Sequence, residues 1–176
     1  MTGKILIAGV ALVLSAVATA TATSTLRYEK WVNYRFGIHF DVPSGMTPGQ
    51  EPANGDGRHF TSANGDVSVT VYGENNALFR SVKQQMDNSL SFARKPAVVT
   101  YRRVAKTWYV VSGYEAGKIF YERCIYHDQQ FDTIRIVYPK KDAARFNPIA
   151  AHIAASMRYK EVPPVNGEYL AGTERE

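Results

Sequence analysis

The stretch that decides the fold is AVVTYRRVAKTWYVVSGYEAGKIFYERCIYHDQQFDTIRIVY, residues 97–138. It holds four segments rich in Val, Ile and Tyr, the residue types that favour β-strands, at 97–104, 107–114, 118–126 and 132–138. The connections between these segments are short, whereas a parallel crossover needs roughly a dozen residues or more. The stretch therefore predicts four consecutive antiparallel strands.

Three further strands are predicted on the N-terminal side. Residues 34–42 alternate in polarity, and the apolar positions that share a face are Phe36, Ile38, Phe40 and Val42. Residues 58–62 and 67–72 flank Asn64-Gly65. Both of these turn residues tolerate positive φ, so the segment predicts a β-hairpin.

Two amphipathic helices are predicted. In residues 77–93 one face carries Leu78, Phe79, Val82, Met86, Leu90 and Ala93, and the expected cap is Asn75 or Asn76. In residues 142–157 the apolar stripe is Phe146, Ile149, Ala150, Ile153, Ala154 and Met157. Pro148 interrupts this second pattern, and a start near Asn147 would put the proline in the first turn.

These elements predict an α+β domain over residues 34–159, with a mostly antiparallel sheet of about six to seven strands flanked by two helices. Each helix has one apolar stripe, which it must bury on a sheet, so a layered sandwich is expected. Residues 160–176 contain Pro163-Pro164 and end in Glu-Arg-Glu. They are predicted to form a loosely ordered tail.

The first 22 residues have the layout of a secretory signal peptide. Lys4 precedes an apolar run at 5–16, and small residues follow, with expected cleavage after Ala18, Ala20 or Ala22. The apolar run is shorter than the roughly 20 residues of a membrane-spanning helix. We expect a periplasmic or secreted protein with no membrane span after cleavage. A permanent membrane anchor is the alternative.

The net charge and the cysteine content limit the classes of function that the sequence supports. The chain has 21 basic and 16 acidic residues, a net charge of +5. This positive charge is compatible with anionic envelope components, but it is too diffuse to indicate a nucleic-acid-binding protein. The single cysteine, Cys124, lies in an apolar segment and is expected to be a buried free thiol. Pairing between chains or a nucleophilic role is the alternative.

The segment YRFGI at 34–38, which runs into Asp41-Val42-Pro43, resembles the opening strand of the PsbP-like (Mog/PsbP) group. A set of uncharacterised bacterial exported proteins is similar at NGDGR (54–58), Phe60, Ser112-Gly113 and FYER (120–123). The resemblance spans about 34–159 and implies an antiparallel sheet flanked by helices. Met46 stands near the position where the PsbP group often has Trp, and no metal, manganese-cluster or GTPase contact is carried over.

Catalytic and metal-binding arrangements are weakly supported by the sequence. His39 and Asp41 are two residues apart on one strand and share a face, and His59 could join them if the two strands pair. The chain has no Gly-x-Ser-x-Gly elbow, no His-x-x-x-His spacing and no cysteine pair. We therefore predict no catalytic, metal-binding or cofactor-binding residue. A small periplasmic hydrolase that uses His39 or His59 remains the alternative.

The charged side chains of the predicted strands suggest a binding surface instead. If Phe120, Cys124, Ile134 and Ile136 point to the core, the opposite face carries Tyr121, Arg123 and Arg135, and Arg103 is a further candidate. Arg and Tyr are enriched at interfaces, and Arg binds carboxylates and phosphates in a bidentate manner. The alternative is an ordinary solvated face. A shift of one residue in register would exchange the two faces.

Together these observations predict a non-catalytic binding or accessory module of the bacterial envelope. The expected partner is an envelope protein or an anionic envelope component, and not nucleic acid. We expect a monomer. An inhibitor or immunity protein for an envelope-targeted toxin is a further alternative that the sequence does not separate from the first.

Overall fold

The computed structural model describes residues 26–92, 97–163 and 172–176. The predicted signal peptide at 1–22 lies outside these residues. Within them, no helix is long and apolar enough to cross a membrane.

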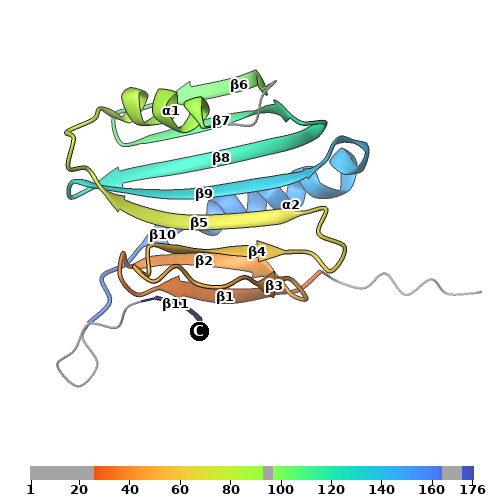
Figure 1. The fold of residues 1–176 in the computed structure, drawn as a ribbon, viewed down its shortest axis with the longest axis horizontal. Helices are drawn as coiled ribbons and strands as arrows, with labels where there is room; N and C mark the ends of the chain where they lie inside the picture. The colour runs from red at the N-terminus through yellow and green to blue at the C-terminus, as the bar shows by residue number, and fades with distance from the viewer. Residues whose placement is uncertain (1–25, 93–96, 164–171) are drawn as a thin grey trace, which may run out of the picture.

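The larger of two sheets has seven antiparallel strands in the order β3-β4-β5-β9-β8-β7-β6 (Figure 1). The strands are β3 (Thr47–Pro48), β4 (Gly57–Thr61), β5 (Ser68–Asn75), β6 (Ala97–Val104), β7 (Trp108–Glu115), β8 (Lys118–His127) and β9 (Gln130–Pro139). Strands β6 to β9 form the predicted antiparallel meander. The hairpin of β4 and β5 is also confirmed, with Gly65 at φ +70° in its turn.

A second sheet of four strands has the order β10-β2-β1-β11. Its strands are β1 (Tyr28–Asn33), β2 (Ile38–Pro43), β10 (Arg158–Tyr159) and β11 (Thr173–Arg175). The predicted single strand at 34–42 is therefore shorter, because residues 34–37 form the turn between β1 and β2. Gly37 has φ +64° there, and a Cβ at this position would lie 2.5 Å from the carbonyl oxygen of Lys160.

The predicted domain limits of 34–159 are too narrow at both ends. Strand β1 begins at Tyr28, and β11, inside the expected loose tail, pairs with it in register Val32 to Glu174. Trp31 is 8% exposed and Thr173 is fully buried. The first strand of the domain, β1, and its last strand, β11, thus pair with each other in the smaller sheet. Such a pairing is not visible in local sequence patterns.

Helix α1 (Val82–Ser91) starts later than predicted. Its N-cap is Ser81, which forms a capping box with Gln84, and not Asn75 or Asn76. The buried Asn76 accepts a hydrogen bond from the Arg80 amide at 2.8 Å and so holds the preceding loop. Leu78 and Phe79, predicted to be on the buried face, lie in this loop and are exposed.

Helix α2 (Ala143–Ser156) follows a short 3-10 turn, η1 (Lys140–Asp142), and matches the predicted position. Pro148 lies inside the helix, so the alternative start near Asn147 is wrong. The helix packs against β2, β8 and β9 and buries Ala150, Ile153 and Ala154.

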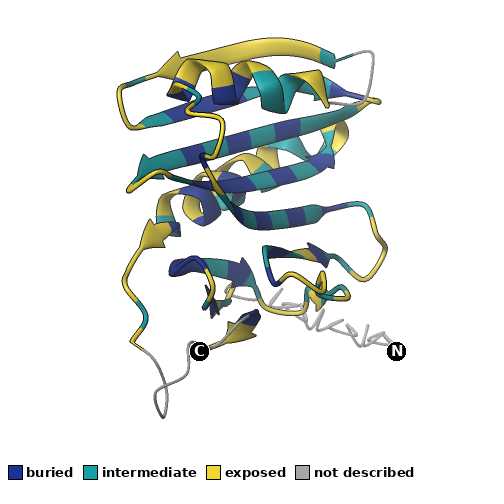
Figure 2. Ribbon diagram, turned by 60° about the vertical axis from the view of Figure 1, so that its left-hand side comes forward, coloured by how far each residue is buried: buried dark blue, intermediate teal, exposed yellow. Residues whose placement is uncertain are grey.

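The central strands of the larger sheet are buried on both faces, whereas the edge strand β6 is exposed (Figure 2). The α2 face packs against α2 and the smaller sheet, through a core that includes Phe40, Phe60, Ile134, Ile136 and Ile153. The α1 face packs against α1, through a core that includes Met86, Tyr109, Phe120, Cys124 and Phe131. The structure confirms the predicted α+β class with its mostly antiparallel sheet and two helices.

Candidate functional site

A groove of about 310 Å³ lies on the α2 face of the larger sheet, beyond the part that α2 covers. It is lined by Thr100, Tyr101, Ser112, Gly113, Tyr114, Ile119, Tyr121, Tyr138 and Asn147. We call this feature the tyrosine groove. Its walls come from β6, β7, β8 and β9, and Asn147 of α2 closes one end.

The groove is hollow because a small side chain stands between two large ones. Tyr101, Ser112 and Tyr121 are direct neighbours across β6, β7 and β8. The Ser112 hydroxyl donates a hydrogen bond to the Phe120 carbonyl oxygen at 2.7 Å, so its polar atom is already satisfied. Tyr101 is 51% exposed and Tyr121 is half-buried, so both rings border open space above Ser112.

Tyr138 and Tyr114 form the end of the groove near α2. The buried Tyr138 hydroxyl donates to Asn147 Oδ1 at 2.9 Å, and Lys140 Nζ lies 4.6 Å from the centre of the Tyr114 ring. Burial raises the pKa of Tyr138 and of Tyr121 above the ordinary value. Both phenols are therefore neutral at physiological pH, and the half-buried Tyr121 presents its hydrogen-bonding hydroxyl on an apolar ring.

The four predicted surface residues do not share one face. Arg103 and Arg123 lie in one cross-strand row through Val110 on the α2 face, and Tyr121 is in the next row. Arg135 is paired with Glu122 and lies on the α1 face. The prediction that placed Arg135 beside Arg123 is wrong, because Phe120 and Cys124 belong to one core while Ile134 and Ile136 belong to the other.

Arg135 is a largely buried structural residue, with 18% of its side chain exposed. Its guanidinium forms ion pairs with Glu115 at 2.9 Å and Glu122 at 2.7 Å, and it lies 4.4 Å from the centre of the Phe120 ring. The Glu122 carboxylate also accepts a hydrogen bond from the Tyr109 hydroxyl at 2.7 Å. This environment leaves the Arg135 side chain little access to a ligand.

Arg123 and Arg103 differ in how accessible their side chains are to a binding partner. Arg123 Nη1 donates to the carbonyl oxygens of Ala154 and Met157, at the C-terminal end of α2, and so stabilises that helix end. Arg103 is exposed, with its guanidinium 5.4 Å from the centre of the Trp108 ring. Of the three predicted arginines, Arg103 is the one free to contact a partner beside the tyrosine groove.

The histidines of the hydrolase alternative point away from each other. Phe40 on β2 and Phe60 on β4 meet across the core, with ring centres 5.9 Å apart. The preceding residues, His39 and His59, alternate with these rings and so point outward from the two sheets. His39 pairs with Glu176, whereas His59 Nδ1 lies 2.8 Å from the Thr70 hydroxyl.

The proposed metal ligands are likewise not brought together. Asp41 lies 2.8 Å from His152 Nε2 on α2 and does not converge with His59. Across the described residues, no group of three or more His, Cys, Asp or Glu side chains is placed to hold a metal ion.

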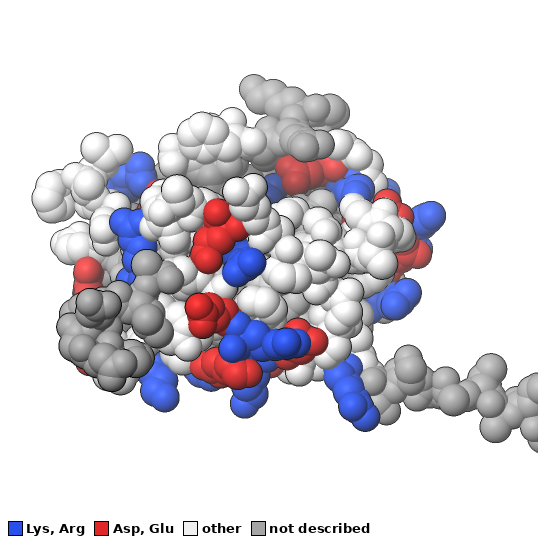
Figure 3. All heavy atoms as spheres, turned by 60° about the horizontal axis from the view of Figure 1, so that its bottom comes forward, with Lys and Arg blue, Asp and Glu red and all other residues white. Residues whose placement is uncertain are grey.

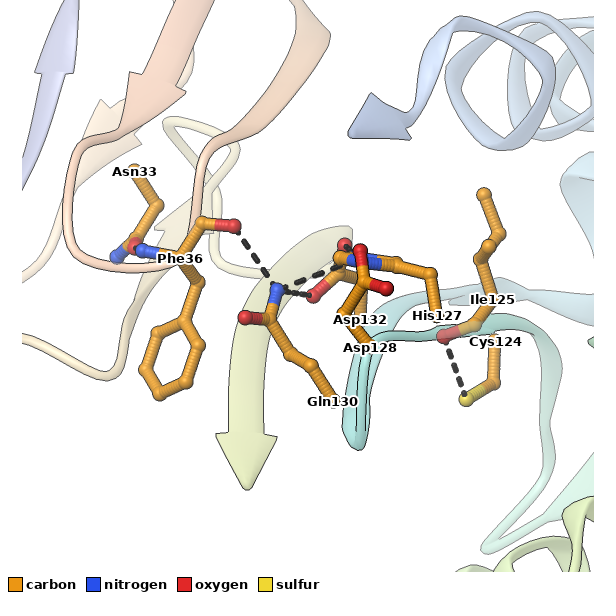
Figure 4. A network of polar contacts seen from close by, with 8 residues as sticks. All are labelled: Asn33, Phe36, Cys124, Ile125, His127, Asp128, Gln130 and Asp132. Carbon is orange, nitrogen blue, oxygen red and sulfur yellow. Dashed lines mark hydrogen bonds and ion pairs between the residues drawn. The ribbon is translucent and has the colours of Figure 1, made fainter. Parts of the chain in front are cut away.

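The structure also contains a partly buried histidine–aspartate pair that no sequence pattern revealed (Figure 4). His127 Nε2 lies 2.8 Å from Oδ2 of Asp132, which is fully buried. Gln130 Nε2 donates to Asp132 and, at 2.9 Å, to the Phe36 carbonyl oxygen. The Tyr159 ring packs against the His127 ring at a tilt, with 4.0 Å between the ring centres. The pair thus connects the β8–β9 turn with the smaller sheet, and its contacts are structural.

Comparison with solved structures places this architecture beside cyanobacterial PsbP (CyanoP) from Synechocystis sp. PCC 6803. The TM-score is 0.60 at 9% sequence identity, over 83% of this chain and 100% of that chain. No protein-family profile and no curated protein matches the sequence. Similarity to the bacterial exported proteins therefore stays a prediction. The fold expected from the opening strand is confirmed, and the chain has a PsbP-like fold.

Proposed function

We propose that this protein is a non-catalytic binding or accessory module and that the tyrosine groove binds a protein partner. The observation that carries the proposal is the open row of Tyr101, Ser112 and Tyr121 on three adjacent strands. Tyrosine is enriched at protein interfaces because its rigid ring buries a large apolar area while its hydroxyl forms hydrogen bonds. The exposed Arg103 extends the same surface with a bidentate donor.

The bacterial envelope is the proposed location of the partner. The signal-peptide pattern of residues 1–22 supports export, and the mature domain would then meet periplasmic or secreted proteins. An envelope protein with a protruding, partly apolar segment would fit a groove of about 310 Å³.

The chemistry of the groove favours binding over catalysis. Its titratable side chains are phenols, and burial raises the pKa of Tyr121 and Tyr138, so both stay protonated at physiological pH and cannot accept a proton as general bases. His39 and His59, on which the hydrolase alternative depends, are held by other contacts on separate sheets.

Site-specific photo-crosslinking in envelope extracts tests the proposal. A photo-reactive phenylalanine analogue in place of Tyr101 should form a covalent adduct with one envelope protein. The same analogue in place of Tyr159, which is 43% exposed on the smaller sheet, is the matched control and should not form that adduct. Combining Tyr121→Ala with the analogue at position 101 should abolish the adduct. An absent adduct, or one that persists with Tyr121→Ala, would contradict the proposal.

A further inference from the structure

The positive charge of the chain is concentrated in one segment. Residues 77–106 contain seven basic residues and one acidic residue, a net charge of +6, whereas the whole chain carries +5. The rest of the chain therefore has a net charge of −1. The composition alone suggests that the positive charge is diffuse, but the sequence concentrates it in residues 77–106.

The same segment carries most of the exposed apolar side chains. Nine large hydrophobic residues are exposed in the described part of the chain, and seven of them lie in this segment: Leu78, Phe79, Phe92, Val98, Val99, Tyr101 and Val104. Phe79 is 81% exposed and Phe92 is 80% exposed. Single exposed apolar residues are normal, but their concentration in one region indicates an interaction site.

The fold brings these residues to one end of the molecule. Helix α1 packs on β7, the neighbour of the edge strand β6, and Figures 1 and 2 show α1 and β6 together at the top. We call this region the α1–β6 end. Its cations Arg102 and Lys106 are exposed and take part in none of the ion pairs found among the described residues.

The opposite side of the molecule provides a contrast. Figure 3 shows basic and acidic side chains next to one another on that side. The ion pairs of the smaller sheet, of β4 and of the neighbouring loops join Arg175 to Glu29, Arg58 to Glu51 and Arg35 to Asp56. Arginines on that side form ion pairs with neighbouring carboxylates, whereas Arg102 and Lys106 at the α1–β6 end take part in no ion pair among the described residues.

The exposure of Leu78 and Phe79 is built into the loop before α1. The Asn76 side chain is buried and bonds both the amide and the carbonyl oxygen of Arg80, at 2.8 and 2.9 Å. Phe79 has φ +50°, which is uncommon for a bulky residue. The loop is thus held in a shape that directs two apolar side chains into solvent.

We infer that the α1–β6 end docks on the surface of an anionic lipid membrane. The apolar side chains would enter the boundary between headgroups and acyl chains, and Arg102 and Lys106 would contact the anionic headgroups. Leu78-Phe79 and Phe92 flank the ten residues of α1, about 15 Å of helix. Such separated apolar tips suit a fluid surface, whereas a protein interface has a contiguous packed centre.

Charge complementarity also argues against a second copy of the chain as the occupant. Two α1–β6 ends would each bring the exposed cations Arg102, Arg103 and Lys106 to the contact, and the like charges would repel. The tyrosine groove opens on the α2 face and shares Tyr101 with this set of exposed residues, but the inference depends on Phe79, Phe92, Arg102 and Lys106, which do not line the groove. A negative result in the test of one site would not contradict the proposal for the other.

Vesicle co-sedimentation tests the inference with the protein as isolated from the cell. Vesicles of phosphatidylglycerol and phosphatidylcholine in equal amounts should bind the protein, and pure phosphatidylcholine vesicles should not. Phe79→Ser/Phe92→Ser should lower the partition coefficient at least about tenfold, because transfer of apolar area is lost. Arg102→Gln/Lys106→Gln should lower it about fivefold for each cation removed.

Lys30→Gln/Lys141→Gln, which removes two exposed cations elsewhere, is the matched control and should bind nearly as well as the wild type. Circular dichroism and thermal unfolding should show that every variant is folded. Equal binding by all variants, or equal binding to neutral vesicles, would assign the affinity to residues 5–16 and overturn the inference. Failure of the wild type to bind anionic vesicles would overturn it as well, and would leave an acidic protein as the partner of this end.

Discussion

Arg135 on β9 and Glu122 on β8 form a partly buried ion pair beneath α1, with 2.7 Å between Nη1 and Oε2. The Glu122 side chain is 2% exposed, and Ser89 of α1 also donates to it. Arg135→Gln would leave the Glu122 and Glu115 carboxylates without their shared cation. We expect the free energy of unfolding to fall by about 3–5 kcal/mol, because an uncompensated charge would be buried. Urea unfolding measures this change.

Arg103→Gln is the control for Arg135→Gln, since it removes an exposed arginine from the same sheet. Its expected effect on unfolding is below about 1 kcal/mol. Equal effects of the two substitutions would contradict a structural role for Arg135. They would also reopen the question of whether Arg135 is available to a ligand.

Gly73 on β5 allows the two sheets to meet at Phe36. A Cβ at position 73 would lie 2.2 Å from the Phe36 ring, and that ring is buried. Gly73→Ala should therefore lower the free energy of unfolding by about 1–3 kcal/mol, the usual range for overpacking. Phe36→Ala should lower it by about 3–5 kcal/mol through cavity formation.

The double variant Phe36→Ala/Gly73→Ala distinguishes a steric clash from a loss of backbone freedom. Because the added methyl group would occupy part of the vacated space, the two effects should be clearly less than additive in chemical denaturation. Strict additivity would show that Gly73 is required for its backbone conformation and not for the approach of Phe36.

Cys124 is a buried free thiol in the α1-face core, and burial raises its pKa to about 12 from an ordinary value of 9.0. Between these two values the thiol ionises in the unfolded chain but not in the folded chain. The stability that this group contributes is present below pH 9 and is lost as the pH rises toward 12. Unfolding of the wild type, relative to Cys124→Ala, should become easier by up to about 1.4 kcal/mol per pH unit in this window.

Thiol labelling checks the same residue independently. Iodoacetamide at pH 8 should modify Cys124 only after denaturation, and the melting temperature should not depend on reductant. Rapid labelling of the folded protein would contradict the buried-thiol assignment. A lower melting temperature with reductant would indicate a disulfide between chains.

The elements that depend on local patterns were predictable. Strands β6 to β9 follow one another with short turns, so their antiparallel order was predicted from residues 97–138. Helix α2 was predicted from its apolar stripe despite Pro148. The hairpin at Gly65 followed from its turn residues. In each case the signal lies within a few residues of the element that it specifies.

The candidate site was predictable in part. Tyr121 and Arg103 were identified as surface residues, but Tyr101, Tyr114 and Tyr138 were not joined to them as a groove. The hollow depends on Ser112 lying between Tyr101 and Tyr121, which is a matter of register across three strands. No local pattern in a single strand contains that register.

The sequence by itself determined the antiparallel meander and the position of α2, because these features are read along neighbouring residues. The tertiary structure decided the face of each side chain. The central strands of the larger sheet are covered on both faces, so apolar residues of one strand or its neighbour point into either core, Phe120 into one and Ile136 into the other, and alternation of polarity does not identify a single buried face. For this reason Arg135 and Arg123, which were predicted to share one face, lie on opposite faces of the sheet. The pairing of β1 with β11 joins the two ends of the domain, and such a contact becomes favourable only once the intervening chain has folded.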